Sequence, residues 1–385
     1  MDRIRSDRIL LPDRLFDGYI YIEDGKICDV TEDARPSERE YDARGLYVSP
    51  GFIDTHTHGG GGYAFEGSAE DIVKGALFHL AHGTTTVCPT ISAAPFSDMA
   101  RSVAQVEAAM NDTRYPGTIL GAHLEGPYLS PAQAGAQAPE VITAPREEEY
   151  LPLLEAHSRA IARWSYAPER DEDARFAKAL ARFGVVASAG HTDAIYADMQ
   201  RAMEQGLRLV THFYSCTSTV TRDHGFRRLG VIETAYLEDA LYVEIIADGK
   251  HLPPELIRLI CKLKGTDRVA LTTDSLALAG TDKTHGFMQS TEFIIEDGVC
   301  KLVDRSAFAG SIATADRLVR VVHKEAGLPL GDAVKMITEV PARIMGLSHK
   351  GRIAPHMDAD LVAFDEDIRP RMVMANGKLC FTEQL

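Results

Sequence analysis

The sequence lacks the features that mark membrane-spanning and disulfide-rich proteins. No stretch of about 20 apolar residues occurs in the chain, so we expect no helix that spans a membrane. The N-terminus is charged from its second residue, which is not the pattern of a signal peptide. The six cysteines are scattered and form no C-x-x-C pair, as is typical of free thiols in a reducing compartment. We therefore expect a cytoplasmic protein.

An excess of basic residues is also missing. The formal net charge is -15, which argues against general nucleic-acid binding because phosphate backbones are bound by basic surfaces. An anionic small substrate is compatible with this charge, but it needs a local basic pocket. The length of 385 residues and the hydrophobic fraction of 45% fit a large α/β unit with a smaller one beside it.

Short strands are expected at both ends of the chain. Near the N-terminus, two β-rich runs flank the Asp24-Gly25 turn, which predicts a hairpin. Near the C-terminus, residues 360–380 are also rich in strand-forming side chains. The strands of either end are too few to bury a core alone. We therefore expect residues 1–46 and 347–385 to form one small β-sandwich domain.

Residues 47–346 alternate short apolar runs with amphipathic stretches of helical periodicity. Eight such units over about 300 residues predict a (β/α)8 TIM barrel. An open, doubly wound sheet is the alternative, but no G-x-G-x-x-G opens a helix after the first strand. The predicted strands are residues 48–58, 85–92, 118–125, 162–168, 185–191, 209–215, 242–247 and 269–274.

Titratable side chains stand at the ends of these predicted strands, where barrels of this kind place their active sites. His56 and His58 end the first strand and point the same way, because side chains alternate along a strand. A single histidine after a strand is usually a hydrogen-bonded loop residue. Several imidazoles and carboxylates gathered in one buried mouth would be costly without a cation. The other residues at these ends are Glu125, His191, His212, Asp248, His251 and Asp274.

This convergence predicts a divalent metal site. Mixed nitrogen and oxygen ligands favour zinc or ferrous iron over magnesium or calcium, with one or two ions per subunit. Such an ion makes hydroxide available near neutral pH and polarises a carbonyl. Asp274 would take the proton of the water and return it to a leaving amine. The predicted chemistry is metal-assisted hydrolysis of a C–N or C–O bond.

Several motifs at these strand ends can be quoted in order along the chain. They are Pro50-Gly-Phe-Ile-Asp-Thr-His-Thr-His, His123-Leu-Glu-Gly-Pro, Gly190-His-Thr-Asp-Ala, Thr211-His, Ala247-Asp-Gly-Lys-His, Thr272-Thr-Asp and Ala309-Gly-Ser. Together they resemble the amidohydrolase superfamily and, within it, the N-acetylglucosamine-6-phosphate deacetylases. The resemblance covers essentially the whole chain. It implies a homodimer that hydrolyses the acetamide of a phosphorylated N-acetyl amino sugar.

The resemblance also implies a role for each ligand. The family's principal metal ligands match Glu125, His191 and His212. A second metal position, which only some members possess, shares Glu125. The further residues of this second position are His56, His58 and the nearby acid/base Asp274.

Substrate contacts follow from the same resemblance. His251 matches a substrate-binding histidine, and Arg222 resembles the arginine that holds the sugar phosphate from the neighbouring subunit. That role implies a homodimer, and it supplies the local positive charge that an acidic protein needs. The other expected substrate contacts are Ala136, Gln137, Ser215, Cys216, Asp248, Phe308, Ala309 and Gly310.

Two departures from the family pattern bear on the substrate. Gln137 stands where the family usually has a histidine that polarises the acetyl carbonyl, and its amide donates a hydrogen bond without charge. After His212 the chain reads Phe-Tyr-Ser-Cys-Thr, where the family commonly has Phe-Asn-Ala-Met. A deacetylase of another amino-sugar phosphate, for example of galactosamine type, therefore stays open. A different amidohydrolase of C–N bonds is the remaining alternative, although strand four has no lysine to carboxylate between two metals.

Overall fold

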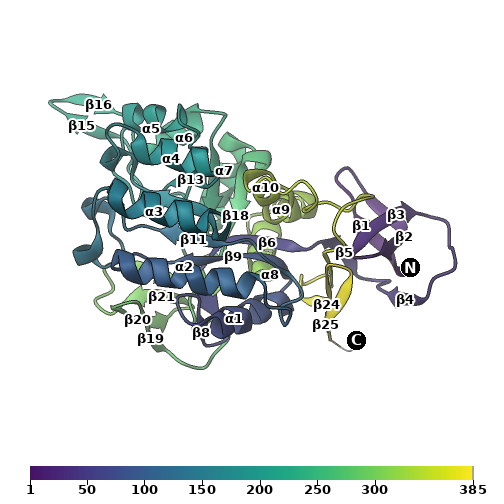
Figure 1. Ribbon diagram of the computed structural model, residues 1–385. Helices are drawn as coiled ribbons and strands as arrows, with labels where there is room; N and C mark the ends of the chain where they lie inside the picture. Colours follow the sequence, from purple (N-terminus) through teal and green to yellow (C-terminus); the bar gives the residue numbers. More distant parts are fainter. Residues whose placement is uncertain (384–385) are drawn as a thin grey trace.

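The computed structural model describes residues 1–383, which form a barrel and a mixed sheet built from both ends of the chain (Figure 1). The mixed sheet has the strand order β25-β24-β23-β5-β1-β2-β3, with β4 beside β1. Its strands are β1 (Asp2–Leu10), β2 (Leu15–Glu23), β3 (Lys26–Thr31), β4 (Arg39–Asp42), β5 (Tyr47–Pro50), β23 (Leu361–Phe364), β24 (Pro370–Ala375) and β25 (Lys378–Thr382).

Strand β5 joins the two ends of the chain. It pairs in parallel with β1 and antiparallel with β23, so N-terminal and C-terminal segments share one ladder. Side chains from both ends, such as Ile4, Ile20 and Leu361, form an apolar core separate from the core of the barrel. The prediction that both termini build one small β unit is confirmed. The division of the chain at residues 46 and 347 stays a prediction.

The barrel consists of eight parallel strands, and each strand lies within or overlaps one of the predicted runs. The predicted barrel is confirmed. A short additional strand, β10 (Thr118–Ile119), also pairs with β9. The eight strands are β6 (Phe52–Thr57), β9 (Thr84–Ile91), β11 (Ala122–Glu125), β12 (Ile161–Tyr166), β13 (Val186–Ala189), β14 (Leu209–Val210), β17 (Tyr242–Ile245) and β18 (Val269–Leu271).

Hydrogen bonds of Asp54 close the seam between β6 and β18. Its carboxylate accepts from the hydroxyls of Thr272 at 2.9 Å and Thr273 at 2.6 Å. The backbone N–H of Asp274 donates to the carbonyl of His56 at 2.9 Å. The end of the last strand is therefore fixed beside the end of the first, which brings Asp274 next to the two histidines.

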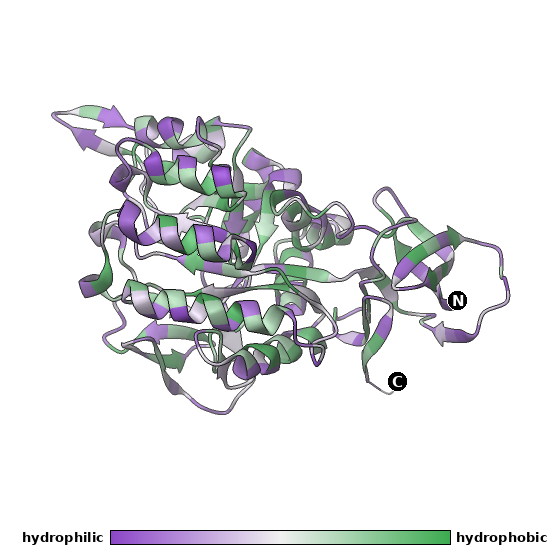
Figure 2. Ribbon diagram, in the orientation of Figure 1, coloured by the Kyte–Doolittle hydropathy of each residue, from purple (hydrophilic) through white to green (hydrophobic). Residues whose placement is uncertain are grey.

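Helices cover the outside of the barrel (Figure 1), and hydrophilic and hydrophobic residues alternate along them (Figure 2). Helix α4 shows the pattern, because Phe176, Ala177 and Leu180 are buried on one face, and Gly184 ends the helix at φ 71°. The helices are α1 (Ala69–Ala81), α2 (Phe96–Met110), α3 (Glu147–His157), α4 (Arg175–Phe183), α5 (Tyr196–Met203), α6 (Val231–Leu237), α7 (Pro254–Lys264), α8 (Ala315–Arg320), α9 (Leu330–Ile337) and α10 (Glu339–Ile344).

Two excursions leave the barrel at the loops. The hairpin β15 (Thr221–Asp223) and β16 (Phe226–Arg228) projects at the end of the molecule far from the N-terminus (Figure 1). The second excursion follows β18 and is a four-stranded antiparallel sheet. Its strands are β19 (His285–Met288), β20 (Thr291–Glu296), β21 (Val299–Leu302) and β22 (Phe308–Gly310), and a further short pair is β7 (Gly59–Gly60) with β8 (Tyr63–Ala64). Among the helices of residues 1–383, none has the length and apolar character that crossing a membrane requires.

Candidate metal centre

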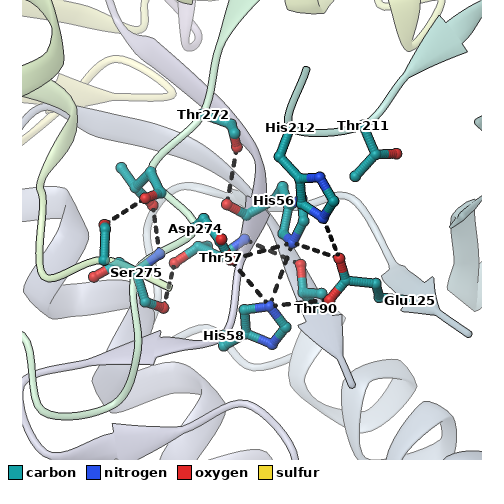
Figure 3. Close-up of polar contacts among 12 residues, drawn as sticks. His56, Thr57, His58, Thr90, Glu125, Thr211, His212, Thr272, Asp274 and Ser275 are labelled. Carbon is teal, nitrogen blue, oxygen red and sulfur yellow. Dashed lines mark hydrogen bonds and ion pairs between the residues drawn. The ribbon is translucent and has the colours of Figure 1, made fainter. Parts of the chain in front are cut away.

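Glu125 lies beside His56, His58 and His212 at the carboxyl ends of the strands (Figure 3). Its Oε1 atom is 3.2 Å from Nε2 of His191 and 3.0 Å from Nε2 of His212. Its Oε2 atom is 3.4 Å from Nε2 of His58, and its Oε1 atom is 3.5 Å from Nε2 of His56. The structure thus brings the predicted ligands from strands β6, β11, β13 and β14 into one place.

Asp274, which follows strand β18, completes the cluster. Its Oδ1 atom is 3.4 Å from Nε2 of His56 and 3.2 Å from Nε2 of His58. All six predicted ligands are buried, so water does little to screen the charges of the carboxylates.

The donor atoms fit two divalent ions that share one carboxylate. His56, His58 and Glu125 form one buried triad, and Glu125, His191 and His212 form another, with ligand atoms within 4.8 Å of one another in each. Zinc binds nitrogen and oxygen at about 2.0–2.2 Å, so neighbouring donors of a tetrahedral site lie about 3.3 Å apart. The observed separations of 3.0–3.5 Å match this spacing.

Each of the four histidines presents Nε2 to the centre while its Nδ1 faces an acceptor. A hydrogen bond at Nδ1 selects the tautomer with a free lone pair on Nε2, which a metal requires. The acceptors are Glu244 Oε1 for His56 at 3.2 Å, Ser92 Oγ for His58 at 2.9 Å, the Gln133 carbonyl for His191 at 2.9 Å and the Ser215 carbonyl for His212 at 3.1 Å.

The electrostatics of the site favour a cation. Burial lowers the pKa of His56, but the charges of Glu125 and Asp274 raise it more, to about 9. Burial raises the pKa of Glu125, but His56, His191 and His212 hold it well below its usual range. Positive charge beside these carboxylates is therefore favourable, and a bound divalent cation would supply it.

Three of the predicted ligands follow their strands in the left-handed backbone region. The φ angles of His191, His212 and Asp274 are 47°, 28° and 48°. Non-glycine residues adopt this conformation at a cost and keep it only where the surroundings hold them. The turns therefore aim these side chains at the centre directly after each strand ends.

Gln137 supports the bridging carboxylate. Its Nε2 donates to Oε2 of Glu125 at 2.9 Å, and its Oε1 accepts from the backbone N–H of Ala93 at 2.9 Å. One amide hydrogen of Gln137 is thus committed to Glu125, a partner that the sequence did not reveal. The side chain is buried, so this pair of bonds fixes the carboxylate plane against the loop after β9.

A cavity of about 300 Å³ opens over the centre. Most of the predicted substrate contacts line it, while Asp248 lies behind His251 and accepts from its Nδ1 at 3.0 Å. Arg222 is on the projecting hairpin and is not part of this wall. The lining includes the predicted Ala136, Gln137, Ser215, Cys216, His251, Phe308, Ala309 and Gly310, together with Tyr214, Ile246, Met288 and Ala307, which the sequence did not indicate.

A parallel (β/α)8 barrel with imidazole and carboxylate ligands at its mouth defines a class of metal-dependent hydrolases. Residues 47–380 match the model of the amidohydrolase family. The chain belongs to this family and is a metal-dependent amidohydrolase.

Relatives of known structure and function are similar over nearly the whole chain. N-acetylgalactosamine-6-phosphate deacetylase of Shewanella sp. (strain ANA-3) is 30% identical, covering 94% of this chain and 91% of its own. N-acetylglucosamine-6-phosphate deacetylase of Bacillus subtilis (strain 168) is also 30% identical, covering 94% and 93%. A solved mutant of the Mycobacterium smegmatis N-acetyl-D-glucosamine-6-phosphate deacetylase, in complex with N-acetyl-D-glucosamine-6-phosphate, superposes with a TM-score of 0.91 at 30% identity, covering 99% of each chain.

We predict that Gln137→Leu weakens metal binding by about 10- to 100-fold, because Glu125 loses the donor that orients it. Competition with a chromophoric chelator measures this affinity. Gln133→Leu is the matched control, since the Gln133 side chain bonds only Asp193 and its backbone carbonyl, which holds His191, is kept. Equal metal affinity in Gln137→Leu and the wild type would contradict the role of Gln137.

Proposed function

We propose that the protein hydrolyses the acetamide of N-acetylglucosamine 6-phosphate to glucosamine 6-phosphate and acetate. The observation that carries this proposal is the buried six-ligand centre beneath a cavity of about 300 Å³. Cavities of this size suit a small-molecule substrate. The likeness to a structure that holds this sugar phosphate supports the choice of compound.

The residues of the centre divide the catalytic work. These ligands would hold a divalent ion, zinc or ferrous iron, which would lower the pKa of water and polarise a carbonyl. Burial raises the pKa of Asp274, but His56 and His58 lower it more, so its carboxylate is ionised and ready to accept a proton. Asp274 takes the proton of the attacking water and returns it to the leaving amine.

His251 is the proposed contact for the sugar or its acetyl group. Asp248 accepts from its Nδ1, and the ring of Phe308 lies edge-on at 5.0 Å, so the imidazole is held from two sides. The Nε2 atom is then available to a substrate oxygen in the cavity. Ala309 and Gly310 line the same cavity and are further proposed contacts.

The phosphate requires a cation that the cavity wall does not supply. Within the described part of the chain, the lining contains neither lysine nor arginine. The hairpin β15–β16 pairs Arg222 with Arg227, whereas Arg228 is neutralised by Asp223. We propose a homodimer in which this hairpin enters the neighbouring cavity and Arg222 binds the phosphate. The exposed Phe226, 78% accessible at the hairpin tip, supports burial against a partner.

The galactosamine epimer is a second candidate substrate. Relatives named for the two epimers are equally identical to this chain, at 30%. Ser215 and Cys216 lie in the cavity wall where the family pattern differs. We predict acetate release from N-acetylglucosamine 6-phosphate above that from the galactosamine epimer and from unphosphorylated sugar, in a coupled assay across this panel. Turnover of the galactosamine compound alone would replace the first candidate by the second.

We predict that Asp274→Asn lowers kcat by at least about 100-fold, because the amide neither accepts nor returns the proton. Metal at Glu125, His191 and His212 is retained, which elemental analysis of the purified variant checks. Thermal unfolding serves as the control for the fold. Near-normal kcat in a folded, metal-loaded Asp274→Asn would refute the proton shuttle.

We predict that Arg222→Ala raises KM for the phosphorylated sugar by roughly 30-fold or more, because a buried ion pair is lost. KM for the unphosphorylated sugar changes little. Arg228→Ala is the matched control on the same hairpin, since Asp223 already neutralises that guanidinium. An equal rise in KM for both sugars would remove Arg222 from the phosphate site.

A further inference from the structure

A buried ion pair lies inside the barrel beneath the metal ligands. Arg163 on β12 and Glu244 on β17 are both fully buried and face each other across the barrel interior. The guanidinium donates to both carboxylate oxygens, through Nη1 to Oε2 and through Nη2 to Oε1 at 3.1 Å. Barrel interiors are usually filled by branched apolar side chains, so this pair is a departure from the common pattern.

Every donor of Arg163 has an acceptor. Besides the two bonds to Glu244, Nε donates to Ser188 at 3.1 Å, Nη2 to Thr211 at 2.8 Å and Nη1 to the carbonyl of Thr55 at 3.3 Å. A guanidinium carries five N–H groups, and all five are used here. Apolar residues of similar volume often replace a buried ion pair without loss of stability. Stability alone therefore does not explain why the barrel holds these two charges.

Glu244 also contacts a metal ligand. Its Oε1 atom is 3.2 Å from Nδ1 of His56, and its Oε2 atom accepts from the Thr55 hydroxyl at 3.0 Å. Nδ1 of His191 and Nδ1 of His212 each face a backbone carbonyl, and Nδ1 of His58 faces the Ser92 hydroxyl. Of the four, His56 is thus the one whose Nδ1 hydrogen-bonds directly to a carboxylate.

We propose that Glu244, held by Arg163, is the positioning residue for the second metal site. The carboxylate selects the His56 tautomer that presents Nε2 toward Glu125 and Asp274. Arg163 fixes the carboxylate by two parallel bonds, so Glu244 cannot turn away from His56. Among the described residues, the Glu244 carboxylate has Thr55, His56 and Arg163 as its hydrogen-bond partners, and it makes no hydrogen bond to Glu125, His191 or His212, which form the first site. This inference rests on the proposed binding of two ions.

The experiment titrates metal-free protein with Zn²⁺ against a chromophoric chelator and counts bound zinc by elemental analysis. The wild type is expected to bind two ions. Glu244→Leu, which removes every acceptor from this side chain, is expected to weaken the second ion by about 10- to 100-fold and to leave the affinity for the first ion within a few-fold. Ser188→Ala is the matched control, because it removes an Arg163 contact remote from His56 and is expected to keep both affinities.

A second variant separates positioning from folding. Arg163→Met with Glu244→Leu removes the unpaired guanidinium that the single variant leaves, so its thermal stability is expected to exceed that of Glu244→Leu. Its second ion is still expected to bind weakly, because no carboxylate holds His56. Two ions bound with wild-type affinity in this variant, an equal loss at both sites, or a wild type that binds one ion would each overturn the proposal. A failed deacetylation assay with these zinc counts unchanged would refute the proposed substrate and not this role of Glu244.

Discussion

Glu125 is the carboxylate on which the geometry of the centre depends. One of its oxygens faces His191 and His212, and the other faces His58 and the amide of Gln137. A buried carboxylate that touches four imidazoles is stable only where positive charge balances it. Because both triads share this one side chain, its orientation sets the separation of the two sites. The loop that carries Gln137 is therefore part of the metal centre as much as of the cavity wall.

The ligands in turn depend on a polar layer within the barrel. Arg163 links strands β6, β13 and β17 and the turn after β14 through Thr55, Ser188, Glu244 and Thr211, and every one of these groups is buried. Removing one partner of such a pair costs roughly 3–5 kcal/mol, because the other charge stays buried and unpaired. Glu244 in this layer accepts a hydrogen bond from Nδ1 of His56, whereas carbonyl groups of the loops accept from Nδ1 of His191 and of His212. These hydrogen bonds orient the imidazoles independently of substrate.

The strands and the gathering of these side chains at the barrel mouth could be predicted from the sequence for a simple physical reason. Each ligand follows an apolar run directly, so its place in the chain reports its place at the barrel mouth. Partners across the barrel carry no such signal, since the contact of Arg163 with Glu244 depends on strand register and tilt. The one available sign was a charge within an otherwise apolar strand, and both residues show it. Asp248 was expected to contact the substrate. Its carboxylate accepts from the backbone N–H of Lys250 and from Nδ1 of His251, so it lies behind His251.

The acidic composition is compatible with the proposed phosphate substrate because of where the arginines of the hairpin lie. A net charge of -15 repels a dianion at long range, but salt screens that repulsion beyond about 8–10 Å. Binding then depends on a few guanidinium groups at contact distance. A cation on a hairpin remote from its own centre leaves the empty cavity free of an uncompensated positive charge. Since the hairpin pairs Arg222 with Arg227 on one face, assembly of two chains would deliver two charges together to the position where the cavity wall has none.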